Sequence, residues 1–261
     1  MTLFLYLMIG ALAGTLAGLL GVGGGLVVVP ALAFLFAAQE VDAGVIMHLA
    51  LGTSLATIVV TAASSSYAHH RRGAVLWDVV ARLTPGLVVG VFVGALMADH
   101  LPTRALTVIV GLFALSVAAQ MAFGAPPRPH RTLPGTGGQV GAGALIGGVS
   151  AFVGIGGGSL TVPYLAWCNI ALQRAVATSA ACGLPIALAG ALGYMAAGRG
   201  AEALPAGSTG YVYWPAFIGI AFTSLLFAPL GARFAHALPT RILKRVFALV
   251  LALVGLRMLL W

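Results

Sequence analysis

The sequence predicts an all-α integral membrane protein made of two repeats, each with four hydrophobic segments. Composition, the length of the apolar runs and an internal repeat support this prediction. Of the 261 residues, 61% are hydrophobic and only 7% are charged, whereas soluble domains average about 25% charged residues. This composition excludes an ordinary soluble enzyme, a disordered chain and a nucleic-acid-binding protein. The net charge of +8 indicates loops that face anionic lipid and the cytoplasm.

Eight apolar segments are long enough to approach or cross a bilayer, whose hydrocarbon core of ~30 Å takes roughly 20 helical residues. They lie at 3–36, 44–67, 77–97, 106–123, 140–170, 175–197, 211–232 and 243–260. Between the fourth and fifth segments, proline, glycine and arginine replace the apolar pattern at 124–138, which indicates a linker. We therefore expect one repeat at 1–123 and a second at 139–261.

Three motifs recur in the same order in both halves. They are GVGGG at 21–25 and GIGGG at 154–158, Thr53-Ser54 and Thr178-Ser179, and LPTR at 101–104 and 238–241. The two copies of each motif lie about 130 residues apart, so the chain has the pattern of a duplication.

The first segment of each half carries a triple glycine near its middle. A straight helix over 3–36 would measure roughly 50 Å, which is too long for one crossing and too short for two. Each glycine costs about 1 kcal/mol inside a helix, so we expect a helical hairpin or a broken helix at both places.

Charge placement favours hairpins that enter from opposite sides and do not cross. In that arrangement ten of the 13 Lys and Arg residues lie on one side, as the positive-inside rule expects. Eight simple crossings would divide the basic residues evenly and are the alternative. The favoured prediction is an inverted repeat with two re-entrant, glycine-broken segments.

The glycine runs are the leading candidates for a binding site. A helix that restarts after each run exposes free N–H groups and the positive end of its dipole, which together bind anions. The candidate residues are Gly23, Gly24, Gly25, Gly156, Gly157 and Gly158. The alternative is that they only allow close helix packing, as expected for glycines at GxxxG spacing. A dinucleotide motif is excluded because Leu26 and Ser159 stand where it needs glycine.

Hydroxyl side chains near these runs could donate to the same anion. The candidates are Thr53, Ser54, Ser159, Thr178 and Ser179. The alternative is that they bond the backbone of the preceding turn, as Ser and Thr in apolar helices often do.

His48 is the candidate for proton coupling, because it lies one turn before Thr53 and none of the five acids falls within an apolar segment away from its ends. An interfacial histidine is the alternative. We expect no catalytic residues, metal site or cofactor, since Cys168 and Cys182 have no His or acid at metal-ligand spacing.

The repeated pattern resembles the TauE/SafE family of sulfite exporter-like membrane proteins. The matching segments are AGLLGVGGGLVVVPAL and SAFVGIGGGSLTVPYL, followed by LGTSLA and VATSAA. The resemblance implies a multi-pass carrier of the bacterial inner membrane that moves small sulfur-containing anions, commonly outward.

Together these observations predict a secondary transporter for a small sulfur oxyanion such as sulfite, sulfoacetate or another sulfonate, with export as the direction. A passive anion channel, or a carrier for thiosulfate or a carboxylate, is the alternative. A membrane-embedded enzyme would need an intramembrane acid, a His pair or a metal cluster, and the sequence offers none. The expected partners are the small anion and the lipid bilayer, and the sequence does not indicate an oligomeric state.

Overall fold

The computed structural model describes residues 2–20, 24–124, 131–237 and 240–261. This part of the chain is helical apart from a small β-hairpin and a 3-10 turn, η1 (Gly198–Gly200). The helices are α1 (Thr2–Leu20), α2 (Gly25–Ala38), α3 (Ile46–Arg71), α4 (Trp77–Asp99), α5 (Thr103–Phe123), α6 (Thr136–Val153), α7 (Gly158–Trp167), α8 (Leu172–Ala197), α9 (Trp214–Ala237) and α10 (Thr240–Leu260). Strands β1 (Ser208–Thr209) and β2 (Val212–Tyr213) pair antiparallel between α8 and α9.

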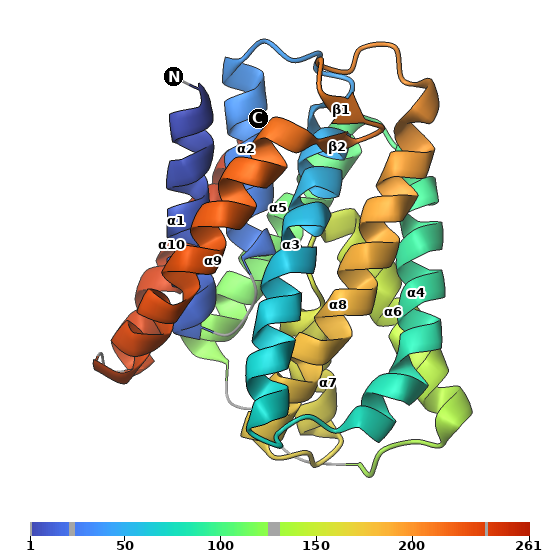
Figure 1. Cartoon of the computed structure of the whole chain (residues 1–261), viewed down its shortest axis with the longest axis vertical. Coiled ribbons are helices and arrows are strands. Elements are labelled where there is room, and N and C mark those ends of the chain that lie inside the picture. The colour runs from blue at the N-terminus through green and yellow to red at the C-terminus, as the bar shows by residue number, and fades with distance from the viewer. Residues whose placement is uncertain (1, 21–23, 125–130, 238–239) are drawn as a thin grey trace.

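The connections between helices gather at two ends of the molecule (Figure 1). The upper end in this view holds residues 39–45, 100–102 and 198–213, and the lower end holds 72–76, 131–135 and 168–171. At the upper end the Thr103 hydroxyl donates to the Gly44 carbonyl oxygen at 2.7 Å. Helices α3, α4 and α8 each run between the two ends and form the frame of the fold.

Two pairs of helices turn back on themselves (Figure 1). The start of α1 lies beside the end of α2, where the Tyr6 hydroxyl donates to Gln39 Oε1 at 2.9 Å. The residues before α6 lie beside the end of α7, where the Arg131 guanidinium sits 5.1 Å from the centre of the Trp167 ring. The start of α1 and the end of α2 lie toward the upper end of the molecule. The start of α6 and the end of α7 lie toward the lower end.

The two helical hairpins pack on the rest of the chain through equivalent glycines. A Cβ on Gly10 of α1 would lie 2.5 Å from the carbonyl oxygen of Ile220 in α9. A Cβ on Gly143 of α6 would lie 2.5 Å from the carbonyl oxygen of Leu83 in α4. The motif alignments that pair the two glycine runs and the two LPTR runs also pair Gly10 with Gly143 and Leu83 with Ile220. The same contact is thus made twice, and each time it joins one half of the chain to the other.

Helices α5 and α10 meet through one glycine from each. A Cβ on Gly111 would lie 3.1 Å from the Gly255 carbonyl oxygen, and a Cβ on Gly255 would lie 2.9 Å from that of Gly111. The two backbones therefore approach each other closely at these glycines.

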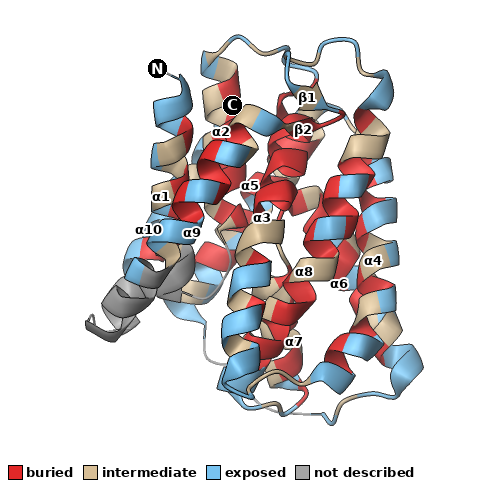
Figure 2. Cartoon of the chain, viewed as in Figure 1, coloured by how far each residue is buried: buried red, intermediate tan, exposed pale blue. Residues whose placement is uncertain are grey.

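The core and the outer surface are both apolar. Figure 2 shows burial concentrated in the upper half of α3, where every residue from 46 to 58 is buried. The outer faces of the surrounding helices expose large apolar side chains such as Phe92, Phe222 and Leu226. Within the described residues, five helices are long and apolar enough to cross a membrane, namely α3, α4, α5, α6 and α8.

The structure divides the chain more finely than hydropathy does. Each of the runs at 3–36 and 140–170 contains two helices, since a break of a few glycines is too short to interrupt an apolar average. Residues 211–213 belong to the β-hairpin connection and not to a helix. The apolar segment predicted from 211 included them because Tyr211 and Val212 are apolar. Helix α6 begins at Thr136, inside the predicted linker.

Candidate functional site

The tips of the two helical hairpins touch inside the protein. A Cβ on Gly25, the first residue of α2, would lie 2.5 Å from the Gly154 carbonyl oxygen and 3.1 Å from the Cα of Ile155. Only glycine permits this approach of two backbones. The Ser54 hydroxyl of α3 donates to the same Gly154 oxygen at 2.9 Å. The glycine runs of both halves therefore meet at one place, next to a predicted site residue.

The second glycine run ends one helix and begins another. Gly154 has φ +69° and closes α6, and its N–H donates to the Ser150 carbonyl oxygen at 2.9 Å. Gly157 has φ +77° and precedes α7, and its carbonyl oxygen accepts from the N–H groups of Leu160 and Thr161. Glycine adopts both left-handed conformations without the strain that a Cβ brings.

The start of α7 offers unused donors. Among the described residues, no acceptor pairs with the backbone N–H of Gly158 or Ser159, as expected for the first turn of a helix. No side chain caps this end. The positive end of the α7 dipole and two free N–H groups are therefore directed at the break over 156–158.

The first glycine run is described only from Gly24 onward, so Gly23 lies outside the described residues. Gly24 has an ordinary right-handed φ of −71°, and its carbonyl oxygen accepts from the N–H groups of Val27 and Val28 at 3.0 Å. A Cβ there would lie 3.4 Å from its nearest neighbour, the Ala13 carbonyl oxygen. Gly24 thus tolerates a side chain that Gly157 does not.

The two predicted threonines make the same bond at opposite ends of the molecule. Thr53 Oγ1 accepts from the N–H of Tyr213, the residue before α9, at 3.0 Å. Thr178 Oγ1 accepts from the N–H of Leu76, the residue before α4, at 3.1 Å. Both threonines are fully buried. Each threonine therefore binds the residue that precedes a helix, and that helix belongs to the other half of the chain.

Two of the predicted hydroxyls have no partner. The Oγ atoms of Ser159 and Ser179 are buried and make no hydrogen bond. The same is true of Ser150 on α6 and Thr161 on α7, which the sequence analysis missed. A comparison of the repeats could have found them, because Ala17 and Val28 occupy the equivalent places in the first half.

His48 is buried at the upper end of α3. Its Nε2 lies 3.0 Å from the Ala98 carbonyl oxygen, and since a carbonyl only accepts, Nε2 carries the hydrogen. Nδ1 has no partner. The Tyr211 ring stacks on the imidazole with centroids 5.0 Å apart, and its hydroxyl donates to Asp99 Oδ1 at 2.7 Å. Burial and this carboxylate raise the pKa of Tyr211, so the phenol stays protonated.

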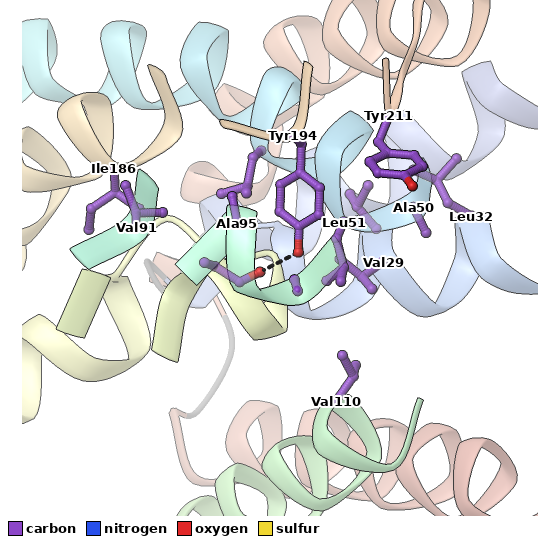
Figure 3. Packing of buried hydrophobic residues seen from close by; sticks show 14 of the residues in the cluster. Val29, Leu32, Ala50, Leu51, Val91, Ala95, Val110, Ile186, Tyr194 and Tyr211 are labelled. Carbon is purple, nitrogen blue, oxygen red and sulfur yellow. Dashed lines mark hydrogen bonds between the residues drawn. The ribbon is translucent and has the colours of Figure 1, made fainter. Parts of the chain in front are cut away.

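Apolar packing holds the hairpin tips in place. The Tyr194 hydroxyl donates to the Ala151 carbonyl oxygen at 3.1 Å, and Figure 3 draws this bond together with Val29 of α2 and Leu51 of α3. A Cβ on Gly154 would lie 2.6 Å from Val29 Cγ2 and 2.9 Å from Leu51 Cδ2. Apolar side chains of α2 and α3 therefore pack against the start of the break at Gly154.

No Lys, Arg, Asp or Glu side chain is buried in the part of the interior whose side chains are described. The described residues also contain no group of three His, Cys, Asp or Glu side chains that could hold a metal ion. An anion at the hairpin tips would therefore be bound by neutral donors.

An apolar exterior, several membrane-length helices and helix breaks inside the protein define a multi-pass α-helical membrane protein. Residues 6–258 match the family described as sulfite exporter TauE/SafE. The chain belongs to this family.

Its relatives are named as membrane transporters. A "probable membrane transporter protein" of Haemophilus influenzae is 38% identical over 259 residues, which cover 99% of this chain and 98% of the relative. Proteins with the same description from Methanocaldococcus jannaschii (27% identical, covering 98% of this chain and 95% of the relative) and Bacillus subtilis (YunE, 25%, covering 99% and 98%) also match. No solved structure matches the chain. These comparisons support a membrane transporter of the TauE/SafE family.

Proposed function

We propose that the protein is a secondary transporter that carries a small sulfur-containing oxyanion, such as sulfite or a sulfonate, out across the bacterial inner membrane. The observation that carries the proposal is the free N-terminus of α7 at the point where the two helical hairpins meet. Helix interruptions near the membrane midplane, with N-terminal ends that face an anion, are a recurring design of secondary transporters. The family description supports the sulfur oxyanion as substrate.

The repeat architecture supports a carrier mechanism. We infer that residues 1–123 and 139–261 form an inverted repeat, joined by the linker at 124–138. The paired contacts of Gly10 with Ile220 and of Gly143 with Leu83 are those expected from it. Inverted repeats allow a protein to expose one central site to either side by exchanging the conformations of its halves.

The threonine bonds supply a way to alternate access. Thr53 links the halves toward the upper end and Thr178 links them toward the lower end. When one end opens, its bond breaks while the other stays. Both bonds are formed in this structure, as expected for a state closed at both ends.

Charge sets the orientation. In the described part of the chain the lower end carries more basic residues than the upper end. They are Arg71, Arg72, Arg82, Arg131 and Arg174 at the lower end, against Arg104, Arg199 and Arg257 at the upper end. By the positive-inside rule the lower end faces the cytoplasm. The α6–α7 hairpin then enters from the cytoplasmic side and the α1–α2 hairpin from the opposite side.

His48 is the proposed proton-coupling residue. Its unpartnered Nδ1 can take up a proton, and Tyr211 connects its environment to Asp99 at the upper end. A proton gradient can act on an imidazole whose second ring nitrogen is free to accept a proton.

The test is uptake of radiolabelled sulfite into proteoliposomes that contain the purified protein, with sulfoacetate, thiosulfate, phosphate and acetate as competitors. Saturable uptake that sulfoacetate inhibits more strongly than acetate supports the proposal. Preferential inhibition by acetate or phosphate would replace the sulfur oxyanion with another substrate, and no uptake above empty liposomes would contradict anion transport.

A further inference from the structure

Four buried serine and threonine hydroxyls without hydrogen-bond partners lie on the three helices around the second glycine break. They belong to Ser150 of α6, Ser159 and Thr161 of α7, and Ser179 of α8. Ser150 and Thr161 are fully buried and Ser179 is 2% exposed. Buried polar groups in folded proteins nearly always have a partner, so each exception requires an explanation.

Seven serine and threonine hydroxyls in the other described helices are satisfied locally. They donate to a carbonyl three or four residues earlier in the same helix, as in Thr15, Thr57, Thr61, Thr84, Thr107, Ser116 and Thr223. This bond is the usual solution for Ser and Thr in an apolar helix. The four hydroxyls around the break do not make it, so their hydrogens are available to something else.

The four hydroxyls lie on the faces that meet the start of α7. Thr161 Oγ1 lies 3.2 Å from the position that a Cβ on Gly157 would take, so it turns back toward the helix N-terminus. Ser179 lies one turn before Gly183, whose own Cβ would lie 2.9 Å from the Gly156 carbonyl oxygen. Residues four apart share a helix face, so Ser179 is on the face that packs on the break.

Ser150 approaches from α6 in the same way. It lies one turn after Ile146, whose Cγ2 is 3.9 Å from the Cβ position at Gly157. The helix faces that carry these hydroxyls therefore border the turn that also presents the free N–H groups of Gly158 and Ser159.

The first half lacks this set of hydroxyls. Ala17, Leu26 and Val28 stand at the places equivalent to Ser150, Ser159 and Thr161. The equivalent of Ser179 is Ser54, whose hydroxyl already donates to the Gly154 carbonyl oxygen. The unpartnered hydroxyls thus belong to the second half alone, although equivalent glycines of both halves make the same packing contact.

We propose that Ser150, Ser159, Thr161 and Ser179 form the substrate site, so that one oxyanion binds asymmetrically in the second half of the chain. The site deepens the proposed transport function and rests on it. Hydroxyls and backbone N–H groups donate to the anion oxygens, and no buried basic side chain of the described interior takes part. Because donors from three helices surround the ligand, a sulfite or sulfonate group with three oxygens fits better than a carboxylate with two, and chloride fits poorly.

The experiment compares Thr161→Val and Ser179→Ala with a matched control, Thr107→Val. Thr107 is 2% exposed and lies in α5, and its hydroxyl is bonded to the Thr103 carbonyl oxygen. Two quantities are measured for each purified variant: the KM for radiolabelled sulfite in proteoliposomes, and the unfolding temperature in detergent without ligand. Chloride and acetate serve as competitors.

Each site variant should raise the sulfite KM about tenfold, because a hydrogen bond to a charged group is lost. Neither should lower the unfolding temperature of the ligand-free protein, since the removed hydroxyl had no partner in the protein. Thr107→Val should leave KM unchanged.

Two results would overturn the site. If the wild type transports sulfite and both site variants keep its KM within about twofold, transport stands and the hydroxyl site falls. If the variants lower the ligand-free unfolding temperature, the hydroxyls are structural and the site falls as well. Absence of saturable uptake by the wild type for sulfite, sulfoacetate, thiosulfate, phosphate and acetate would remove the proposed function itself.

Discussion

Replacing either of the two paired threonines by valine should open opposite ends of the protein. Valine has nearly the shape of threonine but lacks the hydroxyl oxygen that accepts from the N–H of Tyr213 or Leu76. Loss of one such bond costs about 1 kcal/mol, which changes a two-state equilibrium by about fivefold. Thr53→Val should therefore favour the state open at the upper end, and Thr178→Val the state open at the lower end.

Single cysteines can measure this opening. Ala50 and Ala175 are equivalent in the two halves, both are fully buried, and each lies about one turn from its threonine on the side of the nearer end. Each is replaced by cysteine in a background without Cys168 and Cys182, and labelled with a membrane-impermeant maleimide from either side of oriented vesicles. Thr53→Val should accelerate labelling at position 50 by about fivefold, from the outer side only.

The matched result is faster labelling at position 175 from the cytoplasmic side in Thr178→Val. Equal acceleration at both positions in both variants would show general loosening and refute the assignment of one bond to each end. Acceleration at position 175 by Thr53→Val would reverse the assignment.

Three further predictions follow from the packing and the titratable groups. Gly157→Ala should destabilise the protein by roughly 1–2 kcal/mol because of its left-handed φ, whereas Gly24→Ala should be tolerated. Thermal unfolding in detergent compares the two variants, and equal losses of stability would contradict this prediction. Gly10→Ala and Gly143→Ala should each lower stability by about 1–3 kcal/mol through overpacking, and a large asymmetry between them would argue against equivalent contacts. His48→Gln keeps a donor for the Ala98 carbonyl oxygen but has no ring nitrogen that can accept a proton. Uptake of sulfoacetate, whose own charge stays constant from about pH 6 to 8, should therefore lose its pH dependence, and an unchanged pH profile would exclude His48.

The glycine runs allowed the sequence to predict where helices end. Consecutive glycines are unfavourable in any helix, so the restarts at Gly25 and Gly158 follow from local chemistry alone. The β-hairpin before α9 could not be predicted in this way. Its position depends on Thr53, which is distant in sequence and binds the Tyr213 N–H.

The hydroxyls show the same limit. Thr53, Ser54 and Thr178 were expected near the site because they recur, yet their bonds are made to backbone groups far away in the chain. Thr161 has no hydroxyl at the equivalent place of the first half. A single hydroxyl in an apolar helix is normally satisfied by its own backbone. Only the three-dimensional contacts reveal that its oxygen has no partner.

Counterflow of sulfite tests the central claim, that this chain is a carrier with one alternating site. Proteoliposomes are loaded with unlabelled sulfite and diluted into a trace of labelled sulfite, and the label inside is followed over time. We expect a transient accumulation of label above its equilibrium level, and a smaller one in Thr161→Val at the same sulfite concentration. Flux that rises linearly with concentration and shows no transient accumulation would identify a channel and contradict the account.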